Sequence, residues 1–106
     1  MGFETILYEI EGSVATISFN RPEKRNAFNT KMIEEIRIAT EMVSKDEAVC
    51  CVILTGVGLG FSAGADLTEG GKGNWSNTEE ALVKGYQPSL LNIINMPKPI
   101  ISAVNG

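Results

Sequence analysis

Hydrophobic and polar positions alternate, in part, along two short runs near the start of the chain, residues 5–11 and 14–19. Gly12 and Ser13 separate the runs, and a two-residue connection that begins with glycine suits a type II′ turn. Pro22 follows the second run; it cannot donate a hydrogen bond to a strand ladder, and it biases the residue before it toward extended geometry. The pattern predicts a β-hairpin followed by a turn.

A helical periodicity begins at Asn29 or Thr30, either of which can cap the N-terminus of a helix. The spacing of the residues that follow predicts an amphipathic helix that ends near Ser44. On its inner face we expect Ile33, Ile36, Thr40 and Val43, and on its outer face Glu34, Glu35, Arg37 and Glu41.

Two continuous apolar runs, residues 50–55 and 99–104, have the length of strands. Such runs are typical of strands that are covered on both faces, as in a parallel sheet with helices around it. Between them, Ser76 and Glu79 have the spacing of a capping box that opens a helix, and Pro88 is expected to kink or interrupt that helix. This order of elements predicts an α/β fold.

The second apolar run lies at the end of the chain, with no element after it to cover its other face. A central strand of a parallel sheet normally leads into a crossover helix that packs back on the sheet. We therefore expect residues 1–106 to be the N-terminal part of a longer domain. The alternative is an edge strand at a natural C-terminus, covered by a partner chain.

The composition is that of an ordinary globular protein, with 43% hydrophobic residues, 21% charged residues and a formal net charge of −4. This acidic balance argues against nucleic-acid binding, which requires clustered Lys and Arg. No apolar run approaches the length of a membrane span, and the first residues lack the pattern of a secretory signal. We therefore expect a cytoplasmic protein, in which the adjacent Cys50 and Cys51 are small buried thiols without a disulfide.

The absence of histidine from the chain limits its possible chemistry. No Ser-His-Asp or Cys-His arrangement can be assembled within these residues. Two cysteines without a histidine also do not make a structural zinc site, and we predict no metal.

The stretch GLGFSAGADL, residues 58–67, fits three functional motifs. A G-x-S-x-G nucleophile elbow would use Ser62, but this serine lies seven residues beyond the apolar run and has no histidine partner. A G-x-G-x-x-A dinucleotide fingerprint needs a helix directly after it, which the glycines that follow do not favour. The third interpretation is a row of backbone N–H donors for a ligand carbonyl, which small side chains leave accessible. Its members are Ala63, Gly64, Ala65 and Asp66, and the alternative, that these small residues only permit tight packing, stays open.

Four motifs follow one another along the chain: NRP with NAF within residues 20–28, VILTG at 52–56, FSAGADL at 61–67 and PKPIISAVNG at 97–106. Together they resemble the enoyl-CoA hydratase/isomerase (crotonase) superfamily, and the likeness spans essentially the whole chain. The resemblance implies the crotonase fold, an α/β spiral of repeated ββα units, of which this chain would be the N-terminal portion. It also implies a coenzyme A thioester as substrate, no prosthetic group, and a trimer or hexamer of the full-length protein.

The same resemblance implies roles for individual residues. The backbone N–H of Ala65 would be one of two oxyanion-hole donors. Ala63, Asp66 and Leu67 would border the adenine and pantetheine of coenzyme A, and Arg21, Lys24, Arg25 and Ala27 would lie in the turn near its nucleotide end. Independently of the resemblance, three of the nine basic residues fall within five positions of this acidic chain and would attract phosphates, although a solvated charged turn is the alternative.

The second donor of the family, a glycine, and the carboxylates that transfer protons are expected beyond Gly106. We therefore expect the full-length protein to be a hydratase or isomerase that stabilises a thioester enolate, and the 106 residues alone to be inactive. One alternative is a non-catalytic module of the same fold that binds acyl-CoA or serves in assembly. The other is an α/β-hydrolase that uses Ser62.

Overall fold

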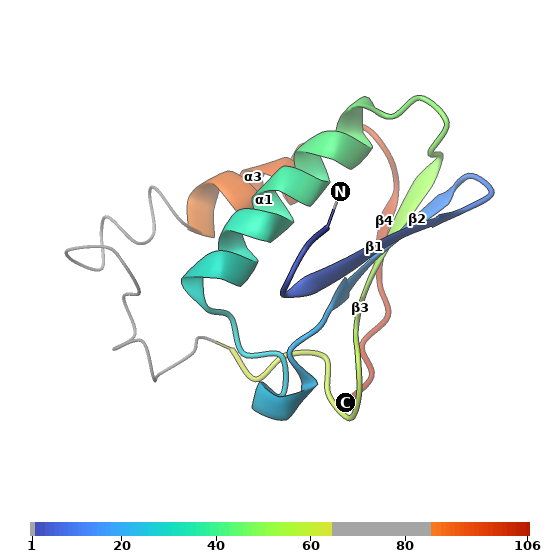
Figure 1. Ribbon diagram of the computed structural model, residues 1–106. Helices are drawn as coiled ribbons and strands as arrows, with labels where there is room; N and C mark the ends of the chain where they lie inside the picture. Colours follow the sequence, from blue (N-terminus) through green and yellow to red (C-terminus); the bar gives the residue numbers. More distant parts are fainter. Residues whose placement is uncertain (1, 65–85) are drawn as a thin grey trace.

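The computed structural model describes residues 2–64 and 86–106, which form a four-stranded mixed sheet with helices on one face (Figure 1). The strands are β1 (Ile6–Glu11), β2 (Val14–Phe19), β3 (Cys51–Gly56) and β4 (Ile100–Ser102), and they lie in this order across the sheet. β1 and β2 are antiparallel, whereas β3 is parallel to β2 and β4 is parallel to β3. The predicted α/β class is confirmed.

The N-terminal hairpin is confirmed in its register and its turn. Glu11 pairs with Val14, which leaves Gly12 and Ser13 as the two turn residues. Gly12 has a φ of 61°, and Ser13 is not among the residues with positive φ. A positive φ at the first turn position alone is the pattern of a type II′ turn, which glycine adopts at little cost.

Helix α1 (Thr30–Lys45) begins and ends close to the predicted residues. The Asn29 side chain caps it by accepting a hydrogen bond of 2.8 Å from the backbone N–H of Met32. The predicted inner face is buried, but the prediction for Glu35 was wrong: this residue is only 4% exposed. Its carboxylate accepts hydrogen bonds from the backbone N–H of Thr5 at 2.7 Å and from the Thr5 hydroxyl at 2.5 Å.

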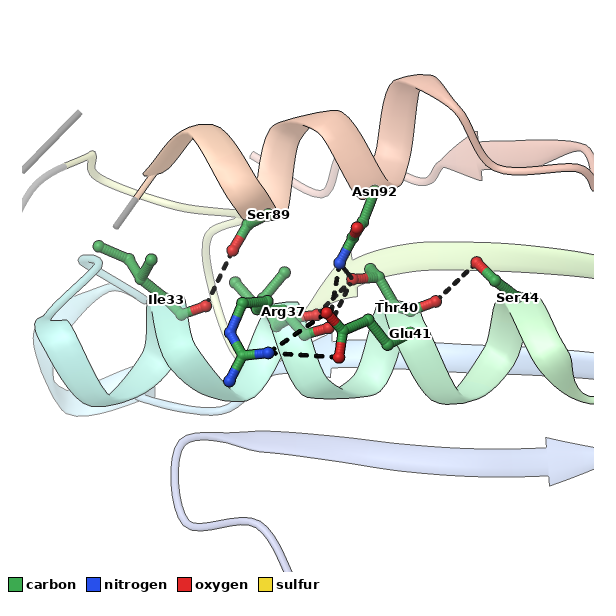
Figure 2. Close-up of polar contacts among 8 residues, drawn as sticks. Ile33, Arg37, Thr40, Glu41, Ser44, Ser89 and Asn92 are labelled. Atoms are coloured by element: carbon green, nitrogen blue, oxygen red, sulfur yellow. Dashed lines mark hydrogen bonds and ion pairs between the residues drawn. The ribbon is translucent and has the colours of Figure 1, made fainter. Parts of the chain in front are cut away.

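Helix α3 (Gln87–Ile94) lies beside α1 on the same face of the sheet (Figure 1). Ser89 and Asn92 join the helices: Ser89 Oγ donates to the Ile33 carbonyl at 3.0 Å, and Asn92 Nδ2 donates to the Arg37 carbonyl at 3.2 Å and to Thr40 Oγ1 at 3.0 Å (Figure 2). Pro88 lies in the first turn of α3, a position where proline is well tolerated. The predicted capping box at Ser76 lies outside the described residues.

The hydrophobic core lies between the helices and one face of the sheet. Its fully buried members include Ile17 of β2, Met32 of α1 and Val52 of β3. The second face of the terminal apolar run, for which the sequence offers no covering element, is open in the described part of the chain. Ile101 is 56% exposed and Val104 is 65% exposed, because the described helices cover only one face of the sheet.

The cysteines lie at the start of β3, away from this core. Cys50 is exposed and Cys51 is half-buried, and neither forms a disulfide. The expectation of buried thiols was therefore wrong: Cys50 precedes the strand, and Cys51 lies on the face of β3 opposite to the buried Val52 and Leu54. Among the helices of the described residues, none is long and apolar enough to cross a membrane.

Candidate functional site

The glycine-rich loop leaves the sheet at the end of β3 and folds back against it. A Cβ atom on Gly56 would lie 2.5 Å from the carbonyl oxygen of Gly60 and 2.7 Å from that of Phe61, closer than real Cβ contacts allow. The close return of the loop therefore requires glycine at position 56. Asn26 and Asn105, which come from two other parts of the chain, hold the loop in place.

Asn26 is fully buried and connects the turn after β2 to the loop. Its Nδ2 donates to the carbonyl oxygens of Val57 at 3.1 Å and Gly60 at 2.8 Å, and its Oδ1 accepts from the backbone N–H of Arg21 at 2.7 Å. Asn26 has a φ of 58°, and asparagine is one of the few residues that adopt this left-handed conformation readily. Its backbone carbonyl also accepts a hydrogen bond of 2.9 Å from the Ser62 hydroxyl.

Asn105 reaches the same loop from the segment after β4. Its Nδ2 donates to the carbonyl oxygens of Gly56 at 2.8 Å and Gly58 at 3.1 Å, and its Oδ1 accepts from the backbone N–H of Gly56 at 3.3 Å. The backbone of Ala103 continues the strand contact, because its N–H donates to the Leu54 carbonyl at 2.7 Å. The end of β4 is thereby fixed to the beginning of the loop.

The last described residues of the loop are tied to the turn around residue 26. The N–H of Ala63 donates to the Arg25 carbonyl at 2.9 Å, and the Gly64 carbonyl accepts from the N–H of Phe28 at 2.7 Å. The N–H of Gly64 donates to the Ser62 hydroxyl oxygen at 3.1 Å. The expectation that Ala63 and Gly64 offer their N–H groups to a ligand was therefore wrong, since both groups have partners within the protein.

The other two predicted donors, Ala65 and Asp66, lie outside the described residues, as does Leu67. The elbow and the fingerprint both need a helix close behind the motif. Residues 61–64 are not helical, and Gly64 has a φ of 96°. The Ser62 hydroxyl donates to a backbone carbonyl and therefore has a structural partner.

An open pocket of about 440 Å³ borders the loop and brings together two of the predicted coenzyme A contacts, Arg25 and Ala63. The remaining lining residues are Leu59, Gly60, Ser62 and Gly106. Arg25 is exposed and has a left-handed φ of 51°, which turns the chain directly before the buried Asn26. The pocket therefore has one cationic residue, Arg25, among lining residues that are otherwise uncharged.

The other residues predicted to contact the nucleotide lie in the same turn but not in the pocket lining. Lys24 ends the short 3₁₀ helix η1 (Pro22–Lys24) and is exposed. Arg21 directs its guanidinium at its own turn, donating to the carbonyl oxygen of Ala27 at 2.6 Å. The structure therefore places Arg25 and Ala63 together in the pocket lining. Lys24 is next to Arg25 in the sequence and is exposed. Arg21 and Ala27 contact each other.

A second, more enclosed cavity of about 280 Å³ lies between α1, α3 and the sheet. Phe19 makes edge-on contacts with Phe28 and Phe61, at centroid distances of 5.2 and 5.1 Å, and all three rings line it. The other lining residues are Ile33, Ile36, Leu54, Tyr86, Ser89, Leu90, Ile93 and Ser102. The cavity is mainly apolar and would favour a hydrocarbon group over a charged one.

Two residues of this site were missed by reasoning from the sequence. Asn26 and Asn105 both fall within the motifs that suggested the family, but the sequence assigned neither of them a role. An asparagine between Arg25 and Ala27 indicates a left-handed turn, and an asparagine before Gly106 indicates a chain reversal. Neither signal indicates that the side chains of Asn26 and Asn105 bind the glycine-rich loop.

The model of the enoyl-CoA hydratase/isomerase family matches residues 9–106. The 1,2-epoxyphenylacetyl-CoA isomerase of Escherichia coli is 36% identical over 97% of this chain, which spans 40% of that protein. Human enoyl-CoA delta isomerase 2 is 39% identical over 99% of this chain, which spans 27% of that protein. The chain therefore spans well under half the length of these curated relatives.

Solved structures support the same relationship. An enoyl-CoA hydratase/carnithine racemase from Magnetospirillum magneticum is 32% identical, with a TM-score of 0.88 over 99% of this chain and 40% of that structure. A putative enoyl-CoA hydratase/isomerase (crotonase) from Legionella pneumophila is 34% identical, with a TM-score of 0.84. The fold is that of crotonases, as predicted. With its motifs, its fold and nearly its whole length matched, the chain belongs to the enoyl-CoA hydratase/isomerase family.

Proposed function

We propose that the protein containing this chain is an acyl-CoA hydratase or isomerase in which the backbone N–H of Ala65 stabilises a thioester enolate. The observation that carries the proposal is the fixation of the glycine-rich loop immediately before Ala65. Asn26 and Asn105 hold its carbonyl groups, and the backbone of residues 63 and 64 is bonded to the turn at Arg25 and Phe28. A donor that is held rigidly needs little reorganisation when charge develops on the carbonyl oxygen.

The chemistry follows from the acidity of the thioester α-carbon. Loss of an α-proton, or attack of water at the β-carbon of an enoyl thioester, transfers negative charge to the thioester oxygen. One N–H donor aimed at that oxygen contributes about 2.7–4 kcal/mol to lowering the barrier. A second donor and at least one carboxylate that moves the proton are expected beyond Gly106, so the 106 residues alone should not turn over substrate.

The exposed cluster of Lys24 and Arg25 supports the choice of coenzyme A as the carrier. Both residues lie in the turn that the loop contacts, and Arg25 borders the open pocket. Phosphate groups at the nucleotide end of coenzyme A would interact with these cations, although exposed pairs contribute only about 0.2–1 kcal/mol each. We further propose that the full-length protein is cytoplasmic, and that it is a homo-oligomer, as the resemblance implies.

The proposal is tested by assaying the full-length protein for hydration of crotonyl-CoA and for double-bond migration in a 3-enoyl-CoA. Turnover of either substrate supports an enzyme, and the reaction that is observed distinguishes a hydratase from an isomerase. Binding of acyl-CoA without turnover of any enoyl thioester would instead indicate a non-catalytic module. Covalent labelling of Ser62 by a fluorophosphonate would contradict both and favour a hydrolase.

The role of Arg25 has its own test, the variant Arg25→Ala compared with Lys45→Ala in the last turn of α1. We expect Arg25→Ala to weaken acyl-CoA binding about 1.5- to 5-fold, the range of an exposed ion pair. The corresponding acyl-pantetheine has no phosphate, so its affinity should be unchanged by the substitution. An equal loss for both ligands, or an equal effect of Lys45→Ala, would contradict a contact between Arg25 and the nucleotide.

A further inference from the structure

Asn105 is the one asparagine of the chain that is followed by glycine. In such a pair the backbone nitrogen of the glycine can attack the side-chain amide of the asparagine, because glycine has no side chain to shield this nitrogen and adopts conformations that other residues avoid. Asn105 is exposed, so water reaches its side chain. The pair therefore has the chemistry of spontaneous deamidation, and the contacts of Asn105 oppose that reaction.

Three hydrogen bonds hold the Asn105 side chain against the glycine-rich loop. Its Nδ2 donates to the carbonyl oxygens of Gly56 at 2.8 Å and Gly58 at 3.1 Å, and its Oδ1 accepts from the N–H of Gly56 at 3.3 Å. Both N–H donors of the amide are therefore in use. Deamidation expels this nitrogen, so the two Nδ2 bonds must break, and local opening of the contact limits the reaction.

The reaction needs only the chain itself and water. The Gly106 nitrogen loses its proton and forms a bond to Cγ of Asn105, the bond from Cγ to Nδ2 breaks, and the amide nitrogen leaves as ammonia, which carries that proton. Water then opens the cyclic succinimide at one or the other of its carbonyl groups. One opening gives aspartate at position 105. The other gives isoaspartate, in which the main chain runs through the side-chain carbon atoms.

Both products lose the donors that hold the loop. An aspartate carboxylate is ionised at neutral pH and has no hydrogen to donate, so it would face the carbonyl oxygens of Gly56 and Gly58 with a negative charge. Isoaspartate also lengthens the main chain before Gly106. A Cβ atom on Gly106 would lie 2.5 Å from the carbonyl oxygen of Leu59, so the backbone approaches the loop closely here, and a longer chain would shift this approach.

We propose that Asn105 is a site of spontaneous deamidation, that its hydrogen bonds to the glycine-rich loop slow the reaction, and that its conversion releases the loop from the end of β4. Asn26 provides a comparison within the chain. Its Nδ2 also donates to two loop carbonyls, those of Val57 and Gly60, but Asn26 is buried and is followed by alanine, so it should keep its amide. The inference does not depend on the proposed function, because it concerns only the covalent structure of the chain.

The first experiment follows Asn105 and Asn26 in the full-length protein at pH 7.4 and 37 °C, with and without 6 M guanidinium chloride. Peptide mass spectrometry detects the exchange of the amide nitrogen for oxygen, and protein isoaspartate methyltransferase labels the isoaspartate product. We expect Asn105 to convert about 10- to 100-fold more slowly in the folded than in the unfolded protein, the factor that two hydrogen bonds represent. Equal rates in the two states, or conversion of Asn26 ahead of Asn105 in the folded protein, would overturn the proposal.

The second experiment measures amide hydrogen exchange in the loop of the full-length protein. Asn105→Asp reproduces the aspartate product, and Asn92→Asp is the matched control, because Asn92 Nδ2 also donates two hydrogen bonds, but these join α3 to α1 (Figure 2). We expect exchange in the peptide that covers residues 56–60 to accelerate about 10- to 100-fold in Asn105→Asp and to be unchanged in Asn92→Asp.

Unchanged exchange at residues 56–60 in Asn105→Asp would overturn the release of the loop. Acceleration that extends equally to peptides from α1 would also overturn it, because the cause would then be a general loss of stability. The deamidated fraction of aged wild-type protein, separated by ion exchange, gives the same readout without a substitution. It therefore decides the question if Asn105→Asp does not fold.

Discussion

Glu35 occupies a position in α1 that periodicity assigned to solvent, yet its carboxylate is buried. Three donors surround it: the backbone N–H groups of Glu4 and Thr5, and the hydroxyl of Thr5. The carboxylate thereby fixes the segment before β1 to the helix layer. Burial alone would raise the pKa of Glu35, but the hydrogen bonds from Thr5 and Glu4, together with the charge of Lys31, outweigh burial and lower the pKa.

This lowered pKa predicts a pH dependence of stability. A carboxyl group with a lower pKa in the folded than in the unfolded protein binds fewer protons when folded, so its contribution is present above the unfolded pKa and is lost as pH falls through the folded pKa. The free energy of unfolding should therefore fall below about pH 4.3, the ordinary pKa of glutamate, more steeply for the wild type than for Glu35→Gln. Urea denaturation of both proteins between pH 7 and pH 3 tests this; parallel curves would contradict it.

Gly56 permits a second prediction at the level of a single residue. Gly56→Ala would force a methyl group against the backbone of Gly60 and Phe61, and overpacking of this kind costs about 1–3 kcal/mol. Gly60→Ala is the matched control, because a Cβ at Gly60 would meet no atom within 4 Å and its φ is not in the left-handed region. Denaturant midpoints that fall equally for both variants would show that the close return of the loop is not the cause.

At the scale of elements, α1 is defined by its cap and by its buried face. The Asn29 side chain satisfies the N–H of Met32, one of the groups that a helix N-terminus leaves without a partner. Asn29→Ala should therefore destabilise the protein by about 0.5–2 kcal/mol, measured by thermal or urea denaturation. Asn29→Asp should retain most of the stability, because aspartate caps equally well; a similar loss in both variants would argue against the cap.

The two faces of the sheet both carry apolar side chains, although only one of these faces is covered by the described helices. Val52 and Leu54 of β3 face the helices and are buried, whereas Ile101 of β4 is largely exposed on the other face. Continuous apolar runs predicted strands correctly, but they did not indicate which face was covered. That depends on the layers that surround the sheet, which belong to the arrangement of elements rather than to any one strand.

At the scale of the whole molecule, the distribution of charge predicts a salt-dependent affinity. The chain carries a net charge of −4, yet Lys24 and Arg25 lie together at the turn beside the open pocket. Attraction between these exposed cations and phosphates is screened over about 10 Å at 0.1 M salt. The dissociation constant for acyl-CoA should therefore rise severalfold between 0.05 and 0.5 M NaCl, whereas that for acyl-pantetheine should not. Calorimetric titration of the two ligands tests this, and equal salt dependence would contradict it.

Local features of the chain were predictable because their causes lie within a few residues. The Gly12-Ser13 turn needs a positive φ at its first position, and Asn29 caps a helix whose first N–H groups are three residues away. The set of motifs likewise predicted the crotonase fold correctly. The donor residue Ala65 and its neighbours Asp66 and Leu67 remain predictions, since they lie outside the described residues.

The sequence by itself determined the strands, the long helix and the family, because periodicity, capping and motif order are local properties of the chain. Only the tertiary structure decided the partners of its polar side chains. Glu35 meets Thr5 across 30 positions, Asn26 meets Gly60 across 34, and Asn105 meets Gly56 across 49. Such contacts depend on how the sheet and helices bring distant segments together, and an asparagine or glutamate in the sequence does not specify which segment it will meet.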